Sequence, residues 1–267
     1  MGTPELMVDG WMAIIKSLVL DEPKREVRPK YLFTLIHGTF ARGAAWTKED
    51  SLLCQELKRT LKEEIGFPPF KWTGDNSHSA REIAAQELVL HIEKVAQLHP
   101  DADHYLICHS HGGNVVLNMA KITNHHNPPH IAELILLACP VQEKTMHLVS
   151  TPMFQRVYSL YSSFDIIQIL APEFKRVYSA HKPHTKRKIR YKLLPFSSRL
   201  FPVYSHLTQT KIKINDYPIS HTRFSTKEFV ALLPTILQKL NTWHQETFAA
   251  NKIIKHKLLC IYKKPNN

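Results

Sequence analysis

Short apolar runs typical of β-strands alternate along the chain with longer stretches of helical periodicity. Between the first two runs, and again between the next two, the apolar residues recur at the spacing of one helix face. This alternation predicts βαβ units, and therefore an α/β fold built around a parallel sheet. The predicted strands are Tyr31–Ile36, Phe70–Trp72, Tyr105–Cys108, Leu134–Ala138, Val157–Tyr161 and Lys211–Asn215.

The chain has 267 residues, enough to bury one sizeable core, and it carries no clear linker or internal repeat. We therefore expect a single domain over residues 1–267, flanked by segments 1–28 and 252–267, whose structure the periodicity does not decide. Asp9 and Lys16 interrupt the first apolar stretch, where a signal peptide would be uncharged. The expected location is the cytoplasm, or outside the cell by a route without a standard signal peptide.

Positive charge is concentrated in one segment. The net charge of the chain is +12, and nine basic residues with one acidic residue, Glu173, lie in residues 172–210, named the basic insertion below. Aromatic residues interleave with these charges, a pattern that suits a polyanionic surface such as an anionic membrane or nucleic acid. A solvated surface insertion is the alternative that composition leaves open.

Neither the cysteines nor the histidines predict a metal site. The four cysteines lack the paired spacing of metal ligands, so we expect reduced and mostly buried thiols. Three of the 17 histidines, His125, His126 and His130, share a proline-rich loop without carboxylates or paired cysteines. No metal and no other cofactor is expected.

Glycines are scarce, and most of them follow predicted strands. The chain has only eight. Gly38 and Gly43 follow the first predicted strand, Gly74 the second, and Gly112 with Gly113 the third. The carboxyl ends of the strands in an open parallel sheet form the edge where ligands bind. We therefore expect the functional site at this edge.

The segment Tyr105–Val116 joins an apolar strand to a helix through a tight turn centred on Ser110. This pattern is typical of a nucleophile elbow, in which the serine takes a strained backbone conformation and small residues stand two positions before and after it. Gly112 fills the second of these positions, and Cys108 replaces the glycine usual at the first. An ordinary strand-to-helix turn is the alternative for this motif alone.

A second motif, His37-Gly38-Thr39-Phe40, ends the first predicted strand. Hydrolases that transfer acyl groups place half of their oxyanion hole at this point. The backbone N–H of Thr39 is the expected first donor. The second is the N–H of His111, which follows the serine at the positive end of a helix.

Taken together, these motifs resemble those of the serine α/β-hydrolases, specifically the lipase-like and esterase-like members. The segment Phe70–Ser77 with Arg81 is also similar to the Trp-Ser-Gly-x-Asn-Ser stretch of some bacterial lipase-like hydrolases, with Thr73 in place of the first serine. The resemblance implies a mostly parallel central sheet flanked by helices. Across it, the predicted strands would lie in the order second, first, third, fourth, fifth and sixth. The expected pocket residues are His37, Trp72, Asn76 and Arg81.

The resemblance also implies that an acid and then a histidine follow later strands and complete a triad with Ser110. Asp165 follows the strand Val157–Tyr161 and is the only acidic residue between Glu143 and Glu173. His221 follows the strand Lys211–Asn215. In this scheme Ser110 attacks, His221 takes and returns the proton, and Asp165 orients the imidazole.

Two alternatives stay open for these roles. His206 competes with His221 as the base, although it precedes its strand, and Asp216 competes with Asp165 as the acid, although a position so close to the strand end suits a loop cap. The choice depends on which side chains the fold brings to the serine.

The expected function is hydrolysis of carboxylic esters, of lipids above all, by a lipase or phospholipase. The basic insertion would then act as a lid that contacts an anionic membrane. A thioesterase or an esterase for small esters is the first alternative. A silent hydrolase fold that binds a protein or nucleic acid is the second, and the complete triad argues against it. The oligomeric state is not predicted.

Overall fold

The computed structural model describes residues 28–122, 129–170, 174–177, 190–193, 198–249 and 257–262. Its centre is an eight-stranded sheet with the order β10-β8-β5-β4-β3-β1-β2, and β9 (Tyr217–Pro218) pairs with β8. Neighbouring strands along this order are parallel, and only β9 is antiparallel. The parallel strands are β1 (Tyr31–Ile36), β2 (Ile65–Gly66), β3 (Asp103–His109), β4 (Ile131–Leu137), β5 (Phe154–Tyr161), β8 (Leu207–Ile214) and β10 (Lys257–Ile261).

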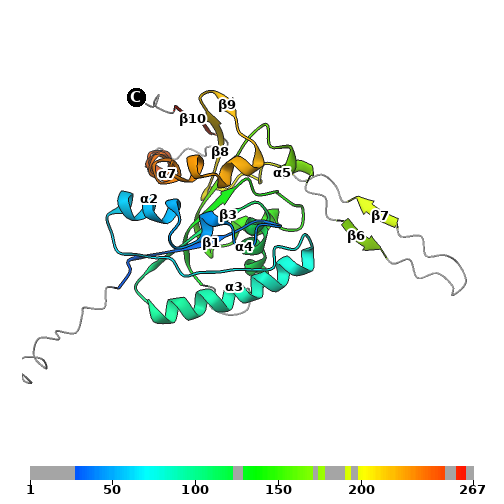
Figure 1. Cartoon of the computed structure of the whole chain (residues 1–267), viewed down its shortest axis with the longest axis horizontal. Coiled ribbons are helices and arrows are strands. Elements are labelled where there is room, and N and C mark those ends of the chain that lie inside the picture. Colours follow the sequence, from blue (N-terminus) through cyan, green and yellow to red (C-terminus); the bar gives the residue numbers. More distant parts are fainter. Residues whose placement is uncertain are drawn as a thin grey trace, which may run out of the picture.

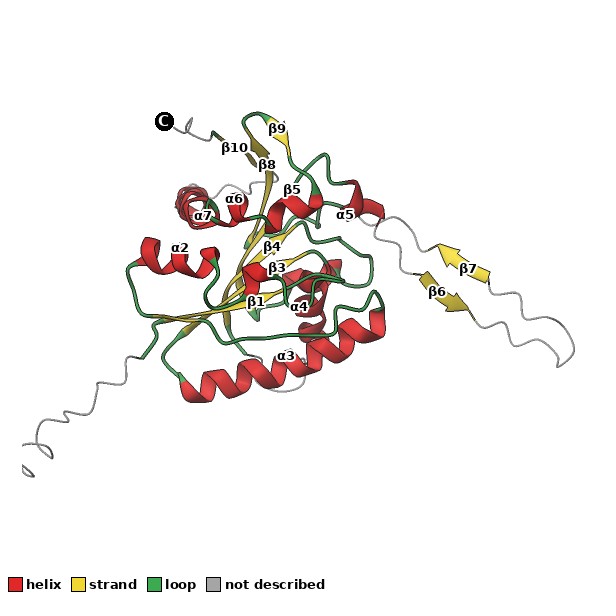
Figure 2. Cartoon of the chain, in the orientation of Figure 1, coloured by secondary structure: helices red, strands yellow, loops and turns green. Residues whose placement is uncertain are grey.

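Helices cover both faces of the sheet, as Figures 1 and 2 show. One face packs against α3 and α4, and the other against α2, α6 and α7. The described helices are α2 (Leu52–Leu61), α3 (His78–Leu98), α4 (His111–Ile122), α5 (Ile166–Leu170), α6 (Lys227–Val230) and α7 (Leu233–Ala249), with 3₁₀ turns η1 (Ala45–Thr47), η3 (Met146–Ser150) and η4 (His221–Ser225). The predicted α/β-hydrolase fold, with its mostly parallel sheet between helices, is thus confirmed.

The predicted strand Phe70–Trp72 is wrong. The edge strand β2 instead covers Ile65–Gly66, where Tyr31 and Leu32 of β1 pair with it. Phe67 follows this strand, and Pro68 and Pro69 come next. A proline has no N–H to donate to the ladder, so pairing ends before them. Phe70 and Trp72 are buried and belong to the core without being part of the sheet, whereas Lys71 between them is exposed.

The other edge of the sheet also differs from the prediction. Strand β8 begins at Leu207 rather than Lys211, so the last residues of the basic insertion belong to the sheet. Strand β10 lies beyond β8 and pairs with it in parallel from Lys257 to Ile261, so β8 is not the last strand. The periodicity of this terminal segment does not distinguish a strand from a helix.

Within the basic insertion, β6 (Phe174–Val177) and β7 (Arg190–Leu193) pair as an antiparallel ribbon. Residues 171–173, 178–189 and 194–197 lie outside the described residues, so the lid role of the insertion stays a prediction. The same holds for His125 and His126, since residues 123–128 are not described. Within the described ranges, no helix has both the length and the apolar character needed to cross a bilayer.

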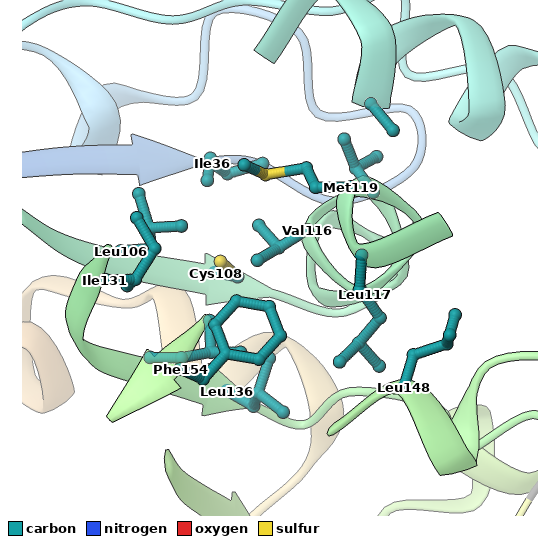
Figure 3. Close-up of a cluster of buried hydrophobic side chains, with 14 of the residues drawn as sticks. Ile36, Leu106, Cys108, Val116, Leu117, Met119, Ile131, Leu136, Leu148 and Phe154 are labelled. Atoms are coloured by element: carbon teal, nitrogen blue, oxygen red, sulfur yellow. The ribbon is translucent and has the colours of Figure 1, made fainter. Parts of the chain in front are cut away.

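The core between the sheet and α4 is drawn in Figure 3. Phe154 of β5 is 2% exposed and lies there with Leu136 and Leu148. Side chains of α4 such as Val116 and Leu117 are fully buried against the same strands. The packing of this layer holds α4 in place directly after Ser110. The core therefore fixes the position of the predicted nucleophile.

Phe154→Ala should lower the free energy of unfolding by about 3 to 5 kcal/mol, because it leaves a cavity where the ring was packed. The measurement is urea unfolding followed by circular dichroism. Phe164→Ala is the matched control, since Phe164 is 62% exposed and its loss should change stability by no more than about 0.5 kcal/mol. Equal effects of the two substitutions would contradict this assignment of the core.

Acid should destabilise the protein through His104 of β3. His104 is 5% exposed, and both of its ring nitrogens are buried without a hydrogen-bond partner among the described residues. Burial lowers the pKa of His104, and the nearby His91 and His99 lower it further. The unfolded chain therefore binds this proton first, so stability is present above about pH 6.5 and is lost as the pH falls below it.

His104→Phe removes the titrating group but keeps a ring of similar size, and should therefore reduce the loss of unfolding free energy between pH 7 and pH 5. Urea unfolding at the two pH values measures this loss. His130→Phe, at an exposed histidine, is the control and should leave the loss unchanged. A pH dependence that is the same in wild type and His104→Phe would show that His104 does not contribute.

Candidate active site

Ser110 occupies a sharp turn between β3 and α4. Its φ is 52°, in the left-handed region that is strained for a residue with a side chain. Two backbone hydrogen bonds hold the turn: Ser110 N–H donates to the oxygen of Leu137 at 2.9 Å, and Gly113 N–H donates to the oxygen of Ser110 at 3.0 Å. This is the geometry that the elbow motif predicts, and it presents the serine at the carboxyl end of β3.

Glycines are required after Ser110 because α4 packs against neighbouring backbone. A Cβ atom at Gly112 would lie 2.6 Å from the carbonyl oxygen of His37 and 2.7 Å from that of Ile36. At Gly113 it would lie 2.5 Å from Cys139 Sγ. Cys108, which replaces the first small residue of the motif, is fully buried, and its side chain points into the core beside Val116 (Figure 3). The departure from glycine is therefore accommodated by the core.

The loop after β1 packs directly against the serine. A Cβ atom at Gly38 would lie 2.9 Å from Ser110 Cβ, so only glycine fits. Phe40 has a φ of 57°, and its N–H donates to the oxygen of Gly74 at 2.8 Å. Thr39 thus lies in a constrained loop beside Ser110, and His111 is the first residue of α4. Thr39 follows a glycine that packs against Ser110, and His111 follows the serine directly.

Asp165 and His221 form a buried pair on the same edge of the sheet. His221 Nδ1 donates to Asp165 Oδ2 at 2.8 Å, and the two residues are 7% and 1% exposed. The backbone N–H of Gln168 donates to the other carboxylate oxygen, Oδ1, at 2.9 Å. Both oxygens of the carboxylate are therefore satisfied, and the His221 ring is oriented with Nε2 directed away from Asp165.

His109, the residue before Ser110, contacts His221 of this pair. His109 Nε2 and the carbonyl oxygen of His221 are 3.2 Å apart, and the two rings have centroids 4.9 Å apart. Among the hydrogen bonds of the described residues, none joins the Ser110 hydroxyl to His221 directly. Catalytic hydrogen bonds are commonly long in the absence of substrate and tighten when it binds.

The two competing residues lie elsewhere. His206 precedes β8, and its Nε2 is 2.9 Å from the carbonyl oxygen of Val149. It therefore lies at the amino ends of the parallel strands, whereas Ser110 lies at the carboxyl end of β3. Asp216 lies in the tight turn between β8 and β9, where its carboxylate accepts the hydroxyl of Tyr262 at 2.9 Å. The structure therefore brings Asp165 and His221 together and keeps both alternatives away from them.

The predicted pocket residues divide into two groups. Trp72 Nε1 donates to the carbonyl oxygen of His37 at 2.9 Å, and the two rings stack with centroids 5.5 Å apart, so this pair supports the loop beside Ser110. Arg81 lies in the first turn of α3 and is fully buried; burial lowers its pKa to about 10. Asn76 precedes α3, with its side-chain oxygen buried. The contacts described place neither Asn76 nor Arg81 against Ser110.

Burial sets the charge of the histidines around Ser110. It lowers the pKa of His109 to about 4 and that of His111 to about 3. Both rings are therefore neutral at pH 7. The Asn114 side-chain amide donates to His111 Nδ1 at 3.3 Å, which places the ring proton of His111 on Nε2.

Three residues that support the site were not predicted from the sequence. Ser162 Oγ accepts the N–H of Ile219 at 3.0 Å and so joins the loop of Asp165 to the loop of His221. Arg199 donates from Nε and from its terminal nitrogen to the carbonyl oxygen of Asp165, at 3.2 Å and 2.9 Å. Gln168 donates to the oxygen of Cys139 at 2.7 Å. These contacts join distant segments, and no local pattern signals them.

The part of the chain that the structure describes contains no cluster of three His, Cys, Asp or Glu side chains arranged to hold a metal ion.

A family model described as serine aminopeptidase, S33, matches residues 77–193, somewhat less than half of the chain. The matched region contains the elbow and Asp165 but neither the loop after β1 nor His221. No curated protein matches the sequence significantly.

Several solved structures are similar to the chain at low sequence identity. Lipase B of Aspergillus fumigatus is 10% identical, with a TM-score of 0.44, over 78% of this chain and 52% of that one. XC6422 of Xanthomonas campestris, described as an α/β serine hydrolase without a lid, is 11% identical, with a TM-score of 0.35, over 91% and 76%. A cutinase of Trichoderma reesei is 16% identical, with a TM-score of 0.33, over 51% and 63%.

The chain spans roughly half to two thirds of the length of the lipase and cutinase chains. Similarity at this level carries no information on substrate. The sheet order, the elbow at Ser110 and the family-model match agree with one another. The chain has the α/β-hydrolase fold, and it resembles the serine hydrolases of that fold.

Proposed function

We propose that the protein is a serine hydrolase that cleaves carboxylic esters with Ser110 as nucleophile, His221 as base and Asp165 as the orienting acid. The observation that carries the proposal is the buried 2.8 Å hydrogen bond between His221 Nδ1 and Asp165, at the sheet edge where Ser110 occupies its strained turn. A hydrogen-bonded Asp-His pair beside an elbow serine is the arrangement that activates a hydroxyl for acyl transfer.

In the proposed reaction, Ser110 Oγ attacks the ester carbonyl carbon while His221 Nε2 takes the hydroxyl proton. The tetrahedral intermediate collapses, the bond to the leaving alcohol breaks, and His221 returns the proton to that oxygen. Water then attacks the acyl-enzyme with His221 as base, and the acid product leaves as Ser110 is regenerated. Asp165 stabilises the imidazolium that forms twice in the cycle.

The oxyanion of both tetrahedral intermediates would accept hydrogen bonds from the backbone N–H groups of Thr39 and His111. Loss of one such donor typically costs about 3 kcal/mol of transition-state stabilisation. Gly38 packs against Ser110 and fixes the first donor, and α4 fixes the second. Both donors are backbone groups on constrained segments, so they need little reorganisation during the reaction.

Apolar side chains around the site support a lipid substrate. Phe40, Phe164, Ile166 and Ile167, named the apolar rim, are 85%, 62%, 54% and 54% exposed. Phe40 is next in sequence to Thr39, the proposed oxyanion residue, and the other three lie within two residues of Asp165. Exposed apolar side chains gathered at one place mark contact sites for apolar partners. An ester with a long acyl chain would cover this rim, whereas a small polar ester would leave it in water.

The basic insertion supports a membrane as the source of that substrate. Its sequence combines a net charge of +8 with interleaved aromatic residues. Basic segments are attracted to anionic lipid surfaces by about 1 kcal/mol for each Lys or Arg near the surface. The insertion follows the apolar rim along the chain, so charge and apolar contact would act on the same lipid surface. Nucleic acid is the less favoured partner, because an ester hydrolase has no chemical use for it.

Ser110→Ala should abolish covalent labelling by a fluorophosphonate probe, because the probe forms its bond to an activated serine oxygen. Ser163→Ala is the control at an exposed serine two residues from Asp165, and it should label like the wild type. Labelling is measured by gel fluorescence and by mass spectrometry of the intact protein. Undiminished labelling of Ser110→Ala, or no labelling of folded wild type, would refute the proposed chemistry.

Turnover of p-nitrophenyl esters should rise with acyl-chain length, because longer chains bury more of the apolar rim. Each added buried methylene is worth about 0.8 kcal/mol at most, which is up to about fourfold in kcat/KM. The comparison includes a thioester of matched chain length. A maximum at the acetyl ester would favour an esterase for small substrates, and a preference for the thioester would favour a thioesterase.

Reversing three charges of the basic insertion, Lys186→Glu, Arg187→Glu and Lys188→Glu together, should weaken binding to anionic liposomes by roughly 100-fold or more. The control reverses three exposed lysines of the helices, Lys58→Glu, Lys94→Glu and Lys239→Glu, with the same change in net charge. Co-sedimentation at increasing salt measures binding. Equal binding and equal salt dependence of the two variants would exclude the insertion as the membrane contact.

A further inference from the structure

We infer that His109, the residue before the nucleophile, is a positioning residue that fixes the loop of His221 against the elbow and the oxyanion loop. The inference rests on the proposed function, since it assigns His109 a role in the proposed Ser110 reaction. Nothing in the elbow pattern requires a histidine at this position, because only the flanking positions must be small.

The first argument is the contact between His109 and the base. His109 is 7% exposed, and its Nε2 is 3.2 Å from the carbonyl oxygen of His221. A carbonyl oxygen can only accept, so Nε2 carries the proton and donates it. Burial keeps the ring neutral, which leaves Nδ1 without a proton. The ring also lies against the His221 imidazole, with centroids 4.9 Å apart and planes inclined by 46°.

The second argument is that the same ring reaches the oxyanion loop. A Cβ atom at Gly38 would lie 3.3 Å from His109 Nδ1 and 3.1 Å from the carbonyl oxygen of His109. One face of the residue therefore packs against the residue before Thr39. His109 itself ends β3, immediately before Ser110. A single buried side chain thus contacts all three loops that the proposed reaction brings together.

The consequence concerns the distance between the base and the nucleophile. Asp165 fixes the rotation of the His221 ring through Nδ1, but it does not fix where the backbone of His221 lies along the sheet edge. The hydrogen bond from His109 holds that backbone in place. Because His109 directly precedes Ser110, this bond fixes the His221 backbone relative to the serine. Proton transfer needs His221 Nε2 within hydrogen-bond reach of the serine oxygen. Loss of the His109 contact should therefore slow activation of Ser110 while the pocket stays unchanged.

The test compares His109→Gln with His109→Met by their rates of fluorophosphonate labelling. The two side chains have the same length, and only glutamine carries a nitrogen donor near the position of His109 Nε2. The second-order rate constant should fall by about tenfold in His109→Met, the usual worth of one buried hydrogen bond, and by less than about threefold in His109→Gln. The labelled fraction at the end point should reach that of the wild type in both variants.

His206→Met is the matched control. His206 also places Nε2 near a backbone carbonyl oxygen, that of Val149 at 2.9 Å, but at the amino ends of the strands, away from Ser110. Its loss should lower thermal stability measured by circular dichroism and leave the labelling rate constant unchanged. This control separates the loss of a histidine-carbonyl contact in general from the loss of this one.

The possible failures are distinguishable. Equal rate constants for His109→Met, His109→Gln and the wild type would overturn the positioning role alone. A purely structural role would also overturn it, and would appear as a lower labelled fraction with a wild-type rate constant for the remainder. Absence of labelling in folded wild type would overturn the proposed function, and the role of His109 with it.

Discussion

The site depends on the close approach of α4 to the end of β1. At Gly112 there is room for a hydrogen atom and nothing larger, because the carbonyl oxygens of Ile36 and His37 lie where a Cβ would be. This contact presses the first turn of the helix against the loop that holds Thr39. Ser110 is left at the bend, with a φ of 52° that the surrounding hydrogen bonds sustain. Packing rather than local preference therefore shapes the turn at Ser110.

The remaining half of the site is held by buried polar contacts. Ser162 joins the Asp165 loop to the segment before His221, and Gln168 contributes its backbone N–H to the carboxylate. Arg199 binds the carbonyl oxygen of Asp165 from the end of the basic insertion. Each contact is worth about 1 kcal/mol, but an unpaired buried partner would cost more. Together they favour a single arrangement of the two loops that hold Asp165 and His221, which are 56 residues apart in sequence.

The sequence predicted the parts of this structure that follow from periodicity and motif. Strands such as β3, β4 and β5 stand out because each contains a short, mostly apolar run. In a parallel sheet, the carboxyl ends of these strands then place Ser110, Asp165 and His221 on one side. The two outermost strands of the sheet, β2 and β10, were harder to predict from the sequence. Pro68 and Pro69 move β2 to an earlier segment, and β10 is a short strand whose pairing depends on β8. The role of Ser162 was not predictable, because a serine makes such a bond only when folding brings it a distant N–H.

Environment, rather than residue type, distinguishes the histidines near Ser110. His109, His111 and His221 all lie at this edge of the sheet, and all three are buried. The first two are kept neutral, and for His109 the cost of burying a charge outweighs the attraction of Asp165. His221 alone among the three has its Nδ1 hydrogen-bonded to a carboxylate, so a positive charge on its ring has a partner. A base must carry a proton during part of its cycle. This contact therefore favours His221 over His109 and His111 for the proposed role of base, and it agrees with the positioning role that we infer for His109.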